Sequence, residues 1–154
     1  MSNETERSPA VRIGDGWIGG VGAGVVGAAA MAALMLAMGA RPVLAGAIPG
    51  LYGLAPPANP AAGVAVHLSH GAVLGVGFAG LCKMAGVRDP VRTAGAGVAY
   101  GVAAWVLLAA LVMPVWLSTV GFPMAPQFPN FAPPSLLWHV VYGGVLGGAF
   151  AAVR

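Results

Sequence analysis

Residues 67–81 read HLSHGAVLGVGFAGL, and they lie within a longer run, residues 42–82, that contains no Asp, Glu, Lys or Arg. A transmembrane helix needs about 20 mostly apolar residues, because the hydrocarbon core of a bilayer is about 30 Å thick. The run is long enough for one such helix and the loop before it. This stretch therefore predicts a membrane-spanning helix that carries histidine side chains.

Further charge-free runs lie on either side, at residues 16–40 and 93–153. The chain of 154 residues is 58% hydrophobic and only 7% charged, whereas about a quarter of the residues in a soluble domain are charged. This composition excludes a soluble globular domain, and it excludes a disordered chain, which needs low hydrophobicity. We expect an all-α membrane protein, a four-helix bundle, with spans at about 17–39, 61–84, 93–117 and 135–153.

The few charged residues gather on one side of the predicted spans. We assign residues 1–15 to a polar cytoplasmic tail and residues 16–154 to a single transmembrane domain, with both termini in the cytoplasm. In this orientation only Arg41, of the 7 basic residues, lies outside, as the positive-inside rule requires. The basic residues form no cluster for nucleic acid. The sequence thus predicts a multi-pass protein of the cell membrane, surrounded by lipid.

Both predicted outer loops are apolar and rich in proline. The second loop, residues 114–134, contains prolines that argue against a regular helix: Pro114, Pro123, Pro126, Pro129, Pro133 and Pro134. One interpretation of these loops is an interfacial segment with its aromatic side chains at headgroup depth. The alternatives are a lid over a site on the outer side and a docking surface for a partner subunit.

The pattern of residues 67–81 occurs a second time, because residues 139–153 read HVVYGGVLGGAFAAV. The alignment pairs His67 with His139, and GAGV also occurs twice, at residues 22–25 and 95–98. The chain is therefore predicted to contain two helical-hairpin repeats, 17–85 and 90–153, related by an axis along the membrane normal.

Small residues recur four apart in the predicted spans, a spacing that allows two helices to pack closely in lipid. We expect the glycines of this GxxxG pattern to form packing surfaces: Gly71, Gly75, Gly97, Gly101, Gly143 and Gly147.

His67 and His139 are the candidate cofactor ligands, and His70 adds a third imidazole one turn from His67. A polar side chain inside a membrane is by default a candidate for a functional residue. One interpretation is that these histidines only hydrogen-bond across the bundle and fix helix pairing. A second is a haem b held between the second and fourth spans, with His67 and His139 as axial ligands. Gly71 and Gly143, each four residues after a histidine, would give the haem ring its room.

A third interpretation is a copper site. Met31, Met35 and Met38 form a helical stripe in the first span, and Met113 lies at a similar depth in the third. Thioether and imidazole ligands favour Cu(I). Met38 and Met113 are the first candidates, because they lie nearest the outer loops, although a methionine stripe also serves as adaptable packing.

The paired motif HxxxGxxLGxxF resembles a group of small uncharacterised four-helix membrane proteins of haloarchaea and some bacteria, some of them labelled histidine kinases. The resemblance implies the fold and no activity. We expect a non-enzymatic accessory or assembly subunit of a membrane complex, such as a respiratory one, or a homo-oligomer, binding through its GxxxG faces and apolar loops. The alternative is haem b or copper binding or transfer through the histidines.

Overall fold

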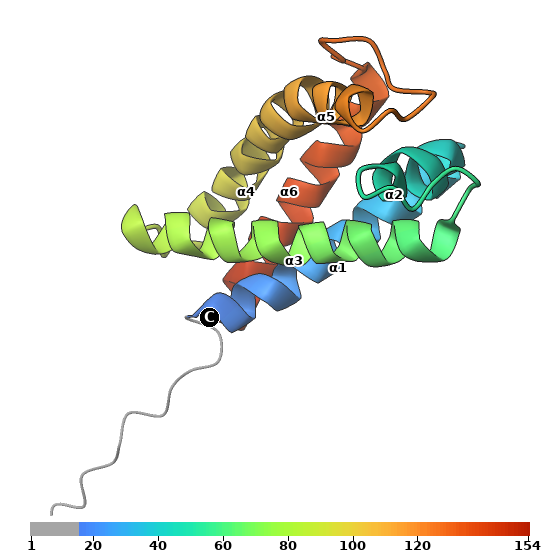
Figure 1. Ribbon diagram of the computed structural model, residues 1–154. Helices are drawn as coiled ribbons and strands as arrows, with labels where there is room; N and C mark the ends of the chain where they lie inside the picture. Colours follow the sequence, from blue (N-terminus) through green and yellow to red (C-terminus); the bar gives the residue numbers. More distant parts are fainter. Residues whose placement is uncertain (1–15) are drawn as a thin grey trace, which may run out of the picture.

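The computed structural model describes residues 16–154, and its regular elements are helices (Figure 1). The prediction of four long apolar helices is confirmed, since each observed helix is long and apolar enough to cross a membrane. They are α1 (Trp17–Ala37), α3 (Pro60–Met84), a third span at Pro90–Thr119, and α6 (Pro133–Val153). The predicted tail, residues 1–15, lies outside the described residues.

Proline and a capping side chain set the starts of two spans. Pro60 and Pro90 occupy the first positions of α3 and of α4 (Pro90–Ala104), where a missing N–H costs nothing. The Asn59 side chain accepts a hydrogen bond from the Ala62 N–H at 3.1 Å, and Asp89 accepts one from the Arg92 N–H at 2.8 Å. The third span therefore begins at residue 90 instead of the predicted 93.

The prediction that the prolines from Pro114 onward exclude a regular helix is wrong at the start of the second outer loop. The helix passes from α4 into the π-helix η3 (Trp105–Val112) and on into α5 (Met113–Thr119). Proline lacks the N–H that an α-helical bond to residue i−4 needs, and the π-helical turns directly before it carry the helix past this position.

The first predicted loop is also partly helical. It contains the π-helix η2 (Val43–Ala47) and the short helix α2 (Ile48–Gly50), in which Leu44 and Ile48 are buried. The Asn59 N–H donates to the Ala45 carbonyl at 2.7 Å and ties this segment to the start of α3. One face of this segment is therefore packed against protein, while Tyr52 and Leu54, directly after α2, are 59% and 47% exposed.

The helices α1 and α6 form the middle of the bundle. Helix α1 packs against α3 and α6, while α4 packs against α6, and α3 has little contact with α4 (Figure 1). Side chains bridge α3 and α6: the Phe78 and Phe150 rings meet edge to face at 5.8 Å, and the Tyr142 hydroxyl donates to the Gly71 carbonyl at 3.0 Å. The space between α3 and α6 is therefore closed at this level by side chains and not by direct helix contact.

Glycines lie where α1 crosses α3 and where α4 crosses α6. A Cβ atom on Gly20 of α1 would lie 2.6 Å from the Gly75 carbonyl oxygen of α3, which is too close for any real Cβ. At the other crossing, a Cβ on Gly147 of α6 would lie 2.7 Å from the Thr93 carbonyl oxygen of α4. The backbones are in contact at these points, which is how helices gain packing energy in lipid.

The substitution Gly71→Ala should lower the free energy of unfolding in detergent by roughly 1–3 kcal/mol, because its methyl group would meet Ala28 and the Gly24 backbone. Gly80→Ala on the same helix is the matched control, since a Cβ there meets no atom within 4 Å. We expect Gly80→Ala to be neutral or slightly stabilising. Equal destabilisation by both changes would contradict the close packing of α1 on α3.

Candidate functional site

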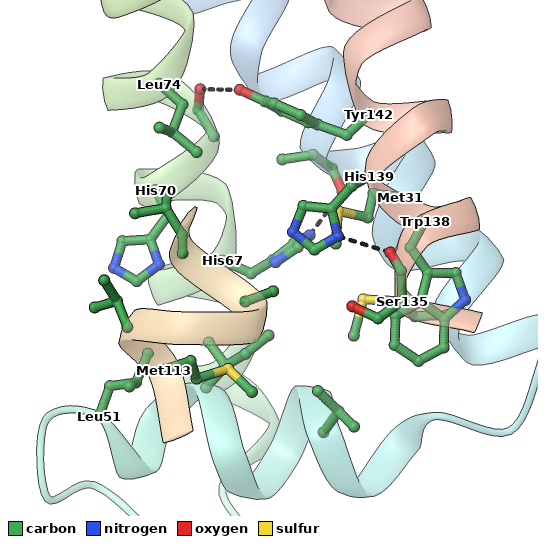
Figure 2. A pocket seen from close by; sticks show the side chains of 18 of the residues that line it. Met31, Leu51, His67, His70, Leu74, Met113, Ser135, Trp138, His139 and Tyr142 are labelled. Carbon is green, nitrogen blue, oxygen red and sulfur yellow. Dashed lines mark hydrogen bonds between the residues drawn. The ribbon is translucent and has the colours of Figure 1, made fainter. Parts of the chain in front are cut away.

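A cavity of about 540 Å³ lies at the end of the bundle where α3 and α6 begin (Figure 2). Side chains from α1, α3 and α6 form its walls, η3 and α5 line another side, and η2, α2 and the residues just after them lie over it. Its surface is predominantly apolar, with a few polar groups directed inward. Such a cavity is the default candidate for a ligand site.

His67 lies in this cavity, and its side chain is buried. Its Nε2 is 3.1 Å from the carbonyl oxygen of Ala28 on α1. A carbonyl can only accept a hydrogen bond, so Nε2 carries the hydrogen of the neutral imidazole and donates it. The other nitrogen, Nδ1, therefore has a free lone pair.

His139 is half-buried and reaches the same cavity from α6. Its Nδ1 donates to the Ser135 carbonyl, one turn earlier on its own helix, at 2.7 Å. The lone pair of this ring is consequently on Nε2. Figure 2 shows that the His67 and His139 side chains extend into the cavity from opposite helices. The predicted pair is thus brought together at one cavity, with a different nitrogen protonated on each ring.

His70 also lines the cavity, but its ring points away from His139 (Figure 2). Its Nε2 lies 2.6 Å from the hydroxyl oxygen of Tyr52, which belongs to the segment that follows α2. The centres of the two rings are 5.7 Å apart. His70 therefore forms a separate pair with Tyr52 at the edge of the cavity and is not a third member of the His67–His139 pair.

Three of the four predicted methionines line the cavity. Met31 and Met35 are buried on α1, and Met113 reaches the cavity from α5. Met38 does not line it: the side chain is 45% exposed, and its sulfur accepts a hydrogen bond from the Trp138 indole N–H at 3.1 Å. Met31, Met35 and Met113 are consequently the thioethers available to a ligand, and Met38 is not.

The room that the haem hypothesis requires beside each histidine is filled. A Cβ on Gly71 would lie 2.8 Å from the Gly24 carbonyl oxygen, and a Cβ on Gly143 would lie 3.0 Å from the Gly101 Cα. The two glycines face α1 and α4 because they form the helix crossings. The backbone of a neighbouring helix therefore occupies the space that a haem ring would need.

The residues of the described chain, 16–154, contain no group of three His, Cys, Asp or Glu side chains that could hold a metal ion. The one cysteine, Cys82, is buried near the far end of α3 and does not line the cavity. Beyond the imidazoles of His67 and His139, the described cavity lining offers a metal ion methionine sulfurs as its soft donors.

Two polar contributors to this site have no signal in the sequence. Tyr52 follows α2 in a proline-rich segment without periodicity. Ser135 contributes only its carbonyl to His139, which no side-chain pattern reveals. Tyr142, in contrast, aligns with His70 when residues 139–153 are placed over residues 67–81. The sequence therefore indicated that Tyr142 belongs with the cavity residues.

Comparison with known proteins finds no match among protein-family models, curated proteins or solved structures. The class of protein therefore follows from the fold alone. Four helices of sufficient length and hydropathy indicate a multi-pass helical membrane protein. Its histidine-lined cavity is the feature from which a function can be argued.

The substitution Tyr142→Phe should destabilise the protein, because it removes the hydrogen bond to the Gly71 carbonyl while keeping the ring. Side-chain hydrogen bonds between membrane helices contribute about 0.6 kcal/mol on average and up to about 1.7 kcal/mol. The change in unfolding free energy, measured by denaturant titration in mixed micelles, should fall in this range. An unchanged value would contradict a structural role for the Tyr142 hydroxyl.

Proposed function

We propose that the protein is a non-enzymatic accessory subunit of a membrane complex, and that it binds Cu(I) between His67 and His139. The observation that supports metal binding is the hydrogen bonding of the two rings. Each donates one ring N–H to a backbone carbonyl and keeps a lone pair on its other nitrogen. Metal-binding histidines generally have this second hydrogen bond, which sets the tautomer and orients the ring.

The ligand types around the pair favour Cu(I) over other metals. Among the described residues that line the cavity, none is Asp, Glu or Cys, and the nearest soft donors are the sulfurs of Met31, Met35 and Met113. Zn²⁺ in structural sites takes four Cys, His or carboxylate ligands, which this cavity does not offer. Imidazole together with thioether is a donor set that suits Cu(I).

Haem b has less support as the ligand. The crossings over Gly71 and Gly143 leave helix backbone where the ring would have to lie. With the orientation that the basic residues favour, the cavity lies near the outer face of the membrane. Copper would then be received or delivered on that side.

The accessory role is supported by exposed aromatic side chains on α5 and in the loop between α5 and α6. Trp116, Phe128 and Phe131 are about half exposed or more. The glycine surfaces, in contrast, are already covered by helix packing inside the chain, where α1 crosses α3 and where α4 crosses α6. A partner subunit or a second copy would therefore bind at the aromatic surface, and not over the glycines as we expected from the sequence.

A duplicated hairpin is part of this proposal. Gly24 and Gly71 meet at one crossing, and their counterparts in the aligned motifs, Gly97 and Gly143, meet at the other. The same pairing at both crossings supports an origin from two copies of one helical hairpin, which would also explain why each copy carries one cavity histidine.

Titration of the detergent-solubilised protein against a chromophoric Cu(I) chelator, under reducing conditions, tests the copper proposal. We expect one Cu(I) per chain, and we expect His67→Ala and His139→Ala each to weaken binding by at least about tenfold. Met31→Leu should also weaken binding, because Met31 lines the cavity, whereas Met38→Leu should not. Both methionine changes nearly conserve volume, so they form a matched pair.

Two results would contradict the copper proposal. One is the absence of stoichiometric Cu(I) binding, and the other is an equal effect of Met31→Leu and Met38→Leu. A reduced-minus-oxidised spectrum of protein taken gently from its native membrane provides an independent check. A b-type haem band that disappears in His139→Ala would show that the ligand is haem instead of copper.

A further inference from the structure

The cavity has an opening on the side of the bundle, between α3 and η3. Five of its lining side chains are substantially exposed, and besides Tyr52 and Trp116 they are Val73 at 70%, Leu108 at 41% and Val112 at 52%. Val73 belongs to α3, and Leu108 and Val112 belong to η3. These residues lie within predicted membrane spans. The opening is therefore apolar and faces the hydrocarbon of the bilayer.

The polar groups at this opening are the paired side chains of His70 and Tyr52. The two share one hydrogen across a distance of 2.6 Å. If Tyr52 donates to Nε2, then Nδ1 of His70 carries a hydrogen and the tyrosine oxygen accepts. If His70 donates, then Nδ1 accepts and the tyrosine hydroxyl can donate. Either way the pair presents one donor and one acceptor, which is the complement of a ligand hydroxyl group.

The depth of this pair limits the head groups that can reach it. His70 is about 15 Å along α3 from Pro60, at a rise of 1.5 Å per residue, and Val73 is about 20 Å along. A phosphate head group at this depth would need a cation, and no Lys or Arg is among the described residues that line the cavity. The site therefore suits a small uncharged head group and excludes a phospholipid head.

We propose that the side opening binds a lipid-soluble molecule with an uncharged, hydroxyl-bearing head group and one hydrocarbon chain, of the alkyl hydroquinone class. A hydroxyl of the head group bonds to the His70–Tyr52 pair. The chain passes Val73 and Leu108 and leaves between α3 and η3 into the bilayer. The ligand uses another polar pair of the same cavity, and the argument for it does not use the copper proposal.

Calorimetric titration of the full chain in nanodiscs with a ten-carbon alkyl hydroquinone, kept reduced under argon, tests this inference, with empty nanodiscs as the reference. We expect saturable binding to the wild type. Leu108→Trp should weaken it by about tenfold or more, because the larger side chain fills the opening. Leu107→Trp is the matched control, since Leu107 is 57% exposed but does not line the cavity, and it should leave the affinity unchanged.

The head group is tested with Tyr52→Phe and with the dimethyl ether of the same hydroquinone. Each removes a hydroxyl from the proposed hydrogen bond, so each should weaken binding by about tenfold. Thermal unfolding followed by circular dichroism, together with Cu(I) titration, verifies that each variant is folded and separates failure here from failure of the copper proposal. Absence of saturable binding, equal loss in Leu107→Trp, or undiminished affinity of the dimethyl ether would each overturn the inference.

Discussion

The close approach of α1 to α3 is the contact on which the site depends. Apolar side chains gain little by leaving lipid, so membrane helices associate through tight packing over small residues. Gly24 and Gly71 bring the two backbones together, and the same approach places the Ala28 carbonyl 3.1 Å from Nε2 of His67. The contact that joins the helices thereby also fixes the proton on one nitrogen of His67 and leaves the other nitrogen available.

His139 is held differently at the crossing of α4 and α6 from the way His67 is held at the crossing of α1 and α3. At the crossing of α4 and α6, the backbone carbonyl of His139 meets Gly101, while the His139 ring bonds to Ser135 within its own helix. The helices α3 and α6 are held apart by Tyr142 and the Phe78–Phe150 pair. The two histidines therefore enter one space from opposite walls, and each presents a lone pair. This arrangement is the basis of the proposal that the cavity binds a soft cation.

Much of the fold could be predicted from the sequence because charge is so rare in it. The four long helices follow from the charge-free runs, and His67, His139 and three of the four candidate methionines line one cavity. Hydropathy does not encode which helices cross each other. For this reason the sequence did not reveal that Gly71 and Gly143, expected to make room for haem, lie at the helix crossings. The passage of the helix through Pro114 and the role of Tyr52 depend on backbone register and loop folding, which no periodic pattern reports.

The tautomers of the two cavity histidines test the central claim most directly. Nitrogen-15 magnetic resonance of the ¹⁵N-histidine-labelled protein distinguishes a protonated from an unprotonated ring nitrogen, and the His67→Gln and His139→Gln variants assign the signals. The structure predicts hydrogen on Nε2 of His67 and on Nδ1 of His139, with one unprotonated nitrogen on each ring. Hydrogen on the same nitrogen of both rings, or on both nitrogens of either, would contradict it.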